Sequence, residues 1–567
     1  MVSPHLKKKK EGQLSLSTGA KKLFQLMYVK KNSPKKEVED SSKIVVSAMV
    51  SKLSFVYEKI RNAVDYDDDH LLRKNAIKRI FKRQLLIEGL IVKNFKSQEL
   101  AIHLLTELIQ AGYLENNSVA ETKVLEIASI LEKYIKLKYD CFRNENLLFS
   151  FYGKRKRNKR RTSKAQKKLL NWILALAAAE IEENLDKDDV KREVVSDMYE
   201  ILKSNISLPK DLPHNKDLDL QIYLAIARNY LNFDEDLLNF IVFKYYNKNW
   251  SKIDTKGISE VAEKIDVLHS VALTQLNHPL GKQLDKIAKS YSLYFSILQE
   301  VIGDNPIKVY DQALNNHKSF VNLIKETCEK RFKKIKNRLW RAGFRSIVYI
   351  FLTKSIFVFL IEIPAVKWFG EDLNLFSLAI NVSFPAFLLF IMIIFTWAPA
   401  KENTKKIIAG VEEIVYSEKR RRNAIVLRKP PKRKFIMDFV FNFLYLVGFS
   451  VTIYFIIKFL DFVQFNWVSI TIFLFFLMFV SFFSFRIKRD IKKFIIIEPK
   501  ENIFTFLFDF FYTPIVAVGK FLSNNASRVN IFVFVLDFII EAPFKVLVEI
   551  FDDWIKYMKE RKDDLVS

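Results

Sequence analysis

The segment SIVYIFLTKSIFVFLIEIPAV, residues 346–366, is apolar apart from a few polar side chains. About 20 such residues in a helix are enough to cross the ~30 Å hydrocarbon layer of a bilayer. Three further stretches are as apolar and as long, at residues 375–398, 436–460 and 467–485. Tryptophans, which favour the membrane–water interface, lie at the ends of these stretches: Trp340, Trp368, Trp397 and Trp467. The sequence therefore predicts four transmembrane helices.

The loops between these stretches differ in charge, which predicts their orientation. Lysine and arginine are retained on the cytoplasmic side of a membrane during insertion. The loop at residues 399–435 is rich in both, whereas the loops at 367–374 and 461–466 contain only Lys367 between them. The chain before residue 346 is basic as well. We therefore expect a multi-pass protein of the cytoplasmic (inner) membrane with both termini in the cytoplasm.

The chain outside the transmembrane region, residues 346–490, is also expected to be helical. Residues 1–45 are polar and lysine-rich, which predicts a flexible basic arm with one short amphipathic turn around residues 21–31. Residues 46–345 show apolar side chains at three-to-four spacing and no alternation of the strand type, which predicts a cytoplasmic all-α domain. The fold class is thus all-α, a polytopic helical membrane protein with a large N-terminal cytoplasmic helical domain. The scarcity of glycine, with 13 residues against 51 phenylalanines, agrees with that class.

The C-terminal residues 491–567 predict amphipathic, membrane-associated helices. Charged side chains recur there at four-residue intervals: Asp537, Glu541, Lys545 and Glu549. This spacing places them in one stripe of a helix, which favours a position in the membrane interface. A fifth and a sixth transmembrane helix remain the alternative.

Two dense basic segments are candidate binding sites for an anionic partner. One lies in a predicted linker at residues 154–168 and the other in the loop at 399–435. Their candidate residues are Lys154, Arg155, Lys156, Arg157, Lys159, Arg160, Arg161, Lys419, Arg420, Arg421 and Arg422. Such blocks attract phosphate groups of lipid headgroups or of nucleic acid. Basic residues recur at 73–83 and 330–345, which favours a function over a solvated linker. Interleaved aromatic residues are missing from the block at 154–168, so anionic lipid is the first expectation and nucleic acid the weaker one.

Polar residues within the apolar stretches are the second set of candidates, because charge in hydrocarbon is costly and tends to be paired or functional. By depth from the cytoplasmic edge, Lys354 is expected near Asn442 and Asp438. Near the outer ends, Glu362 is expected to form an ion pair with Lys458. These residues either line a path for an ion or solute or hold the helices together. The second interpretation is favoured, since a single central lysine without an acidic relay makes a poor path.

Nothing in the sequence supports a catalytic, cofactor or metal site. Phosphate-binding and nucleophile motifs of the GxxxxGK[ST], GxGxxG and GxSxG types are absent. The histidines are scattered without an HExxH motif, and neither Cys141 nor Cys328 belongs to a CxxC motif. The acidic run at residues 65–69, next to His70, is expected to cap a helix rather than bind a cation.

The expected function is that of an integral membrane scaffold or adaptor. Its basic cytoplasmic domain would bind anionic headgroups and recruit a protein or nucleic-acid partner. An ion or small-solute channel or transporter lined by the four spans is the alternative, and a membrane-tethered enzyme is the third. The sequence leaves the oligomeric state open.

Overall fold

The computed structural model describes most of the chain. The described residues are 14–32, 43–44, 46, 48–62, 68–91, 96–143, 159–186, 188–209, 216–394, 401–419, 421, 423–429, 435–492, 495–496, 503–528, 550, 554, 557–558 and 561–562. They are helical apart from turns, short connections, isolated bridges and two-residue strands β1 (Ile206–Ser207) and β2 (Ile425–Val426), which pair in parallel. The all-α prediction is therefore confirmed.

The described residues form two compact units. Unit 1 comprises those within 1–24, 293–422 and 429–530, and unit 2 those within 25–292 and 423–428 together with the few near the C-terminus. The unit boundary at residue 292 differs from the domain boundary predicted at 345, because the helices that follow residue 292 pack with the apolar helices.

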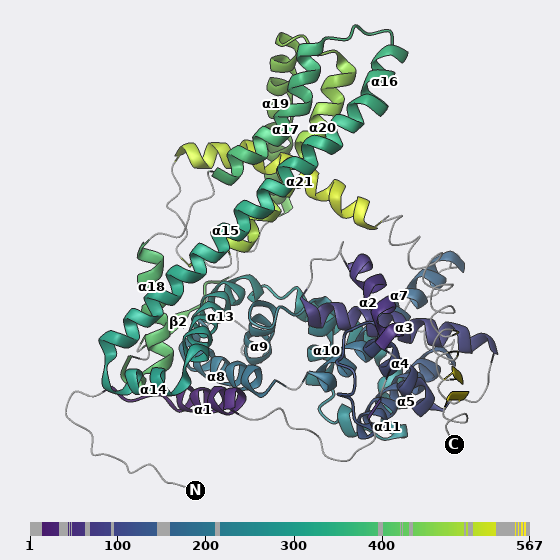
Figure 1. Ribbon diagram of the computed structural model, residues 1–567, viewed down its shortest axis with the longest axis vertical. Coiled ribbons are helices and arrows are strands. Elements are labelled where there is room, and N and C mark those ends of the chain that lie inside the picture. Colours follow the sequence, from purple (N-terminus) through teal and green to yellow (C-terminus); the bar gives the residue numbers. More distant parts are fainter. Residues whose placement is uncertain are drawn as a thin grey trace. The chain divides into compact units, whose positions relative to one another are not determined.

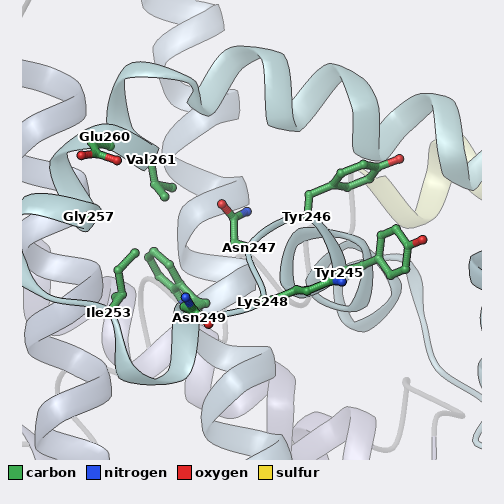
Figure 2. A pocket seen from close by; sticks show the side chains of 10 residues that line it. Tyr245, Tyr246, Asn247, Lys248, Asn249, Ile253, Gly257, Glu260 and Val261 are labelled. Atoms are coloured by element: carbon green, nitrogen blue, oxygen red, sulfur yellow. The ribbon is translucent and has the colours of Figure 1, made fainter.

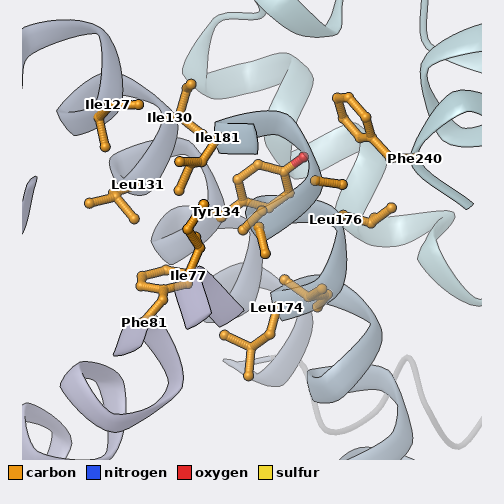
Figure 3. Close-up of a cluster of buried hydrophobic side chains, with 14 of the residues drawn as sticks. Ile77, Phe81, Ile127, Ile130, Leu131, Tyr134, Leu174, Leu176, Ile181 and Phe240 are labelled. Carbon is orange, nitrogen blue, oxygen red and sulfur yellow. The ribbon is translucent and has the colours of Figure 1, made fainter. Parts of the chain in front are cut away.

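Unit 2 is a helical bundle around one large core. Its helices are α2 (Ala48–Asn62), α3 (Asp69–Ile91), α4 (Ser97–Gln110), α5 (Glu121–Arg143), α7 (Lys159–Leu185), α8 (Asp189–Asn205), α9 (Leu218–Asn229), α10 (Glu235–Tyr246), η1 (Trp250–Lys252), α11 (Thr255–Glu263), α12 (Ile265–Leu276), the end of α1 (Thr18–Asn32) and the first half of α13 (Gly281–Asp304). Figure 3 shows the core where Phe81, Leu131, Tyr134, Leu174 and Phe240 meet from α3, α5, α7 and α10. Apolar residues at helical spacing thus give each helix one buried face.

Unit 1 contains the apolar helices. They are α14 (Pro306–Asn315), α15 (His317–Phe357), the π-helical turn η2 (Val358–Glu362), α16 (Ile363–Trp368), α17 (Leu375–Ile394), α18 (Lys401–Val415), η3 (Ser417–Lys419), α19 (Phe435–Phe462), α20 (Trp467–Lys492) and α21 (Ile503–Arg528). Figure 1 shows α15 as one long helix, and α17 lies against it. Helix α17 also packs on α20, and α21 packs on both α20 and α19.

Two helical segments of the described chain are long and apolar enough to cross a membrane. One is residues 317–368, where α15, η2 and α16 continue without a break, and the other is residues 439–462 of α19. Helices α17, α20 and α21 contain shorter apolar stretches. The predicted charged stripe after residue 529 lies outside the described residues.

Residues 14–32 are more ordered than the predicted flexible arm, and the short amphipathic turn predicted around residues 21–31 is part of the longer helix α1 (Thr18–Asn32). Leu16 forms an antiparallel bridge with Tyr416, and the backbone N–H of Ser17 donates to the Val415 carbonyl at 2.8 Å. In the helix that follows, Leu23 and Phe24 are buried. The lysines of this segment are interspersed with a few apolar residues that form one narrow side of the helix. Burial of that side stabilises the helix.

The predicted basic linker at 154–168 is in part a helix. Helix α7 begins at Lys159 and continues to Leu185. Residues 154–158 lie outside the described residues. The apolar residues after Lys168 bury one side of α7 in the core of unit 2, and the helix extends back from them into the basic segment.

Candidate functional site

Five of the six basic residues at 73–83 form ion pairs inside unit 2, and the sixth, Lys82, is exposed. Their ion pairs join Arg73 to Glu182, Lys74 to Asp234 and Asp236, Lys78 to Asp236, Arg79 to Glu58, and Arg83 to Glu107. Arg73 donates from two nitrogens to the two oxygens of Glu182, at 2.7 and 2.6 Å. The recurrence of basic residues at 73–83 therefore does not support binding of an external anion, because internal carboxylates pair with all of the basic side chains except Lys82.

Burial and ion pairing have opposite effects on the pKa of the carboxyl groups in these pairs. Burial tends to raise the pKa of Asp236, but the charges of Lys74 and Lys78 bring that pKa below its ordinary value. At Glu182 burial outweighs the bond from Arg73, so the pKa of this carboxyl lies above its ordinary value. The pairs on α3 are thus structural, and they join it to the helices that supply the carboxylates.

The basic residues of α15 have a different environment. We name as the α15 collar the exposed side chains of Lys333, Lys334, Lys336, Arg338, Arg341 and Arg345. Among the described residues no carboxylate forms a salt bridge with any of them. Arg341 and Arg345 donate only to backbone carbonyls of their own helix, at 3.4 and 3.3 Å. The last residue of the collar, Arg345, directly precedes the apolar stretch that begins at Ser346.

The other predicted basic residues are only partly described. Lys159, Arg160 and Arg161 lie in the first turn of α7, where the structure gives the backbone alone, and Lys154, Arg155, Lys156, Arg157, Arg420 and Arg422 lie outside the described residues. Lys419 donates to Glu412 at 2.6 Å and lies 3.1 Å from Nε2 of His317. Arg421 lies 3.6 Å from Glu413. The two described side chains of this block thus have carboxylate partners within unit 1.

A buried polar cluster joins three of the apolar helical segments. Lys354 Nζ lies 3.5 Å from Oε2 of Glu362, whose other oxygen accepts from Asn381 Nδ2 at 2.5 Å and from Ser469 Oγ at 2.7 Å. These four residues, from α15, η2, α17 and α20, are at most 1% exposed. The ammonium also lies 4.1 Å from the ring centroid of Phe476. The carboxylate thus receives a charge and two hydrogen bonds in an environment without solvent.

The π-helical turn brings the two charges onto one side of the helix. In an α-helix, eight residues would separate Lys354 and Glu362 by roughly 80° around the axis. In η2 the N–H of Ile363 bonds to the Val358 carbonyl five residues earlier. This wider turn advances fewer degrees per residue than an α-helix and reduces that separation. The π-helical turn therefore ends at Glu362, and it moves this side chain toward the side of the helix that holds Lys354.

The structure does not form the ion pairs predicted from depth. Glu362 contacts Lys354 rather than Lys458, which lies 3.7 Å from Asp461 on the exposed side of α19. Asn442 is exposed on α19, and for Asp438 only the helical backbone is described. Depth counting compares positions along the membrane normal but ignores which side of its helix a residue occupies, and this is why the predicted pairing of Glu362 with Lys458 and the predicted contact of Lys354 with Asn442 are wrong.

Sequence reasoning missed Asn381 and Ser469 as partners of Glu362. The sequence does contain a signal for this cluster. Glu362, Asn381 and Ser469 each lie within two helical turns of the outer end of their apolar stretch. Glu362 precedes Trp368, Asn381 follows Leu375, and Ser469 follows Trp467. Depth counted from the outer ends of all spans would have grouped them.

Unit 2 has a surface pocket of about 480 Å³ between the end of α10 and α11. Figure 2 shows Tyr245 and Tyr246 at one side of it and Glu260 at the other. Trp250 lies beneath, where its indole N–H donates to Glu180 at 2.8 Å. The same carboxylate oxygen of Glu180 accepts from the Tyr134 hydroxyl at 2.8 Å, so these buried polar groups bond to one another rather than to the pocket. In the part of the chain that the structure describes, no group of three or more His, Cys, Asp or Glu side chains is placed to hold a metal ion.

Comparisons with known proteins give no relative. No family model matches the chain, and neither the curated proteins nor the solved structures contain a match.

Proposed function

We propose that this chain is an integral membrane scaffold whose α15 collar binds anionic lipid headgroups. The observation that carries the proposal is the contrast between two basic segments of similar composition. The basic side chains of α3 at 73–83, apart from the exposed Lys82, have internal carboxylate partners, whereas those of the collar have none among the described residues. Clusters of four to eight basic residues directly cytoplasmic of a transmembrane helix are typical of anionic-lipid binding.

The apolar surface of unit 1 supports the membrane position. Large side chains beyond the collar project outward, including Phe359 and Leu360, each at least 70% exposed. In water such a surface would be costly, but hydrocarbon solvates it. We propose that residues 346–366, α17, α19 and α20 are the transmembrane helices. The charges of the loops favour both termini in the cytoplasm of a cell whose inner membrane holds the protein.

A channel or transporter is the less supported function. The charges of Lys354 and Glu362 compensate each other, and both side chains are fully buried. A conduction path would need these groups to reach water. We therefore assign the cluster to helix packing, and we propose that unit 2 recruits a cytoplasmic protein partner, with nucleic acid as the weaker alternative.

The proposal is tested on the full-length protein in detergent micelles, supplied with either an anionic or a zwitterionic lipid. We expect anionic lipid to raise the melting temperature, and this gain to fall with added salt. The quadruple variant Lys333→Gln, Lys334→Gln, Lys336→Gln, Arg338→Gln should lose most of the gain, since each basic residue near the surface contributes about 1 kcal/mol.

The matched control removes four other exposed lysines from unit 2, by Lys252→Gln, Lys256→Gln, Lys264→Gln and Lys282→Gln. It makes the same change in net charge and should keep the stabilisation by anionic lipid. Equal responses of the two quadruple variants would refute a specific role of the collar. Release of the wild-type protein from membranes by alkaline carbonate would refute the membrane position itself.

A further inference from the structure

Helix α19 is the least covered of the apolar helices. Within the described residues, only 6% of its apolar stretch is buried, and its main packing neighbour is α21. Phe439 and Leu446 are 66% and 61% exposed, one turn on either side of Asn442. The side chain of Asn442 is exposed as well, and no described group forms a hydrogen bond with its amide.

The depth of Asn442 makes this exposure costly. It lies eight residues beyond Lys434, which corresponds to about 12 Å of helix and therefore to the interior of a ~30 Å hydrocarbon layer. An amide without a hydrogen bond in such a medium costs several kcal/mol, on the order of 4–8 on a cyclohexane scale. Polar side chains in transmembrane helices accordingly face another helix, and they hydrogen-bond across the contact.

Helix α21 does not fill this role, because it packs on a different side of α19. Gly448 marks the side that faces α21, since a Cβ atom at this position would lie 2.8 Å from the Phe510 ring. Asn442 is six residues earlier and roughly 120° away around the helix axis. The uncovered amide therefore points to a neighbour beyond the described helices of this chain.

We propose that α19 of one molecule packs against α19 of a second copy, with the two Asn442 amides hydrogen-bonded to each other. A side-chain amide carries one acceptor and two donor hydrogens, so it is self-complementary. A twofold axis through the contact brings identical residues together at identical depth. A different protein would need a matching polar residue at that depth, whereas a second copy supplies one by symmetry. Phe439 and Leu446 then lie in the contact around the amide pair.

This inference rests on the proposed membrane position of α19, and the experiment separates the two. Cys141 and Cys328, both buried, are first replaced by alanine in the full-length chain. Asn442→Cys is then compared with Val440→Cys, whose position is 41% exposed and roughly 160° away around the helix. Membranes are treated with copper phenanthroline, an oxidant that joins two nearby thiols as a disulfide.

We expect a reducible product of twice the 66.7 kDa chain mass for Asn442→Cys and little of it for Val440→Cys. A disulfide-linked product of another mass would indicate a different protein and overturn the assignment to a second copy. Equal cross-linking at both positions, or none at either, would also overturn it. If alkaline carbonate retains the protein in the membrane, such a failure concerns only the contact. If carbonate releases it, the proposed membrane position fails as well.

Self-association of the chain with its native asparagine gives an independent measurement. Energy transfer between labelled full-length copies is followed as the bilayer is diluted with lipid. Asn442→Leu should weaken association roughly three- to eighteen-fold, the range that corresponds to single interhelical hydrogen bonds. Asn442→Gln should restore part of the loss because it keeps the amide, and Val440→Leu should leave association unchanged. Association that is unaffected by Asn442→Leu contradicts the amide contact.

Discussion

Two lysines among the described residues are completely buried, and their surroundings differ. Lys74 in unit 2 pairs with Asp234 and Asp236, whose side chains are 34% and 25% exposed. Lys354 in unit 1 pairs with Glu362, which is as fully buried as the lysine itself. One ion pair therefore keeps a route to water through its carboxylates, and the other has none.

The difference shows how each unit compensates for a buried charge. In unit 2, two carboxylates together compensate for the burial of the Lys74 ammonium, and one of them, Asp236, also binds Lys78. In unit 1, Glu362 depends on the amide of Asn381 and the hydroxyl of Ser469, and the Lys354 ammonium also lies over the Phe476 ring. Loss of a partner should therefore be tolerated in unit 2 and poorly tolerated in unit 1.

The largest effect is expected for Glu362→Leu. It leaves the Lys354 ammonium buried without a counter-charge, which costs about 3–5 kcal/mol for a buried pair. Thermal unfolding of the full-length protein in micelles measures the loss. Glu362→Gln serves as the comparison, because it keeps an oxygen for Asn381 and Ser469 and should lose less. A melting temperature unchanged by Glu362→Leu would show that Lys354 reaches water.

A smaller loss is expected for Lys74→Met. The two carboxylates retain contact with water and one retains Lys78, so the loss should be about 1.5–3 kcal/mol, the usual contribution of a hydrogen bond to a charged group. Chemical denaturation measures it by the helical circular dichroism signal. The matched control is Lys82→Met on the exposed side of α3, which should change stability by no more than about 0.5 kcal/mol. Equal losses in both variants contradict a special role of Lys74.

Removal of both charges in unit 1 should cost less than removal of one. The double variant Lys354→Met with Glu362→Leu leaves no buried charge, and hydrophobic replacement of a buried ion pair is often near neutral. We expect the melting temperature to recover most of the loss caused by Glu362→Leu. Incomplete recovery would measure the contribution of the bonds from Asn381 and Ser469. A double variant as unstable as Glu362→Leu would contradict charge burial as the cause.

The smallest effect is the acid dependence of the pair in unit 2. Charge pairing lowers the pKa of Asp236 in the folded state, below an unfolded value of about 3.9. This carboxylate therefore contributes stability above about pH 4, and the contribution disappears as pH falls through the lower folded pKa. Denaturation at a series of pH values should show a shallower acid loss for Asp236→Asn than for the wild type. Parallel curves would rule out this linkage.

The sequence predicted the class of the fold but not the partners of its charges. Apolar periodicity and the long apolar stretches identify helices because they depend only on neighbouring residues. The basic segments of α3 and α15 have similar patterns. The carboxylates that neutralise α3 come from distant parts of the chain, as Glu58, Glu107 and Glu182 do. A partial signal exists, since Glu107 and Glu182 interrupt otherwise apolar helical stretches.

The buried polar cluster illustrates a second limit. Lys354 and Glu362 stand eight residues apart in one apparent helix, and regular geometry assigns them to different sides. Only the π-helical turn of η2 brings them together, and no residue pattern at 358–362 identifies such a turn in advance. The predicted partners therefore came from other spans, and the actual partner lies on the same helix.

The uninterrupted helix from His317 to Trp368 has a mechanical consequence. Its residues 317–345 extend about 43 Å beyond the predicted transmembrane segment. Such a rod transmits tilt as a lever, so a 10° change in the inclination of the span displaces its far end by about 7 Å. A change in bilayer thickness that alters the tilt would thereby become a lateral displacement far from the lipid, without any hinge.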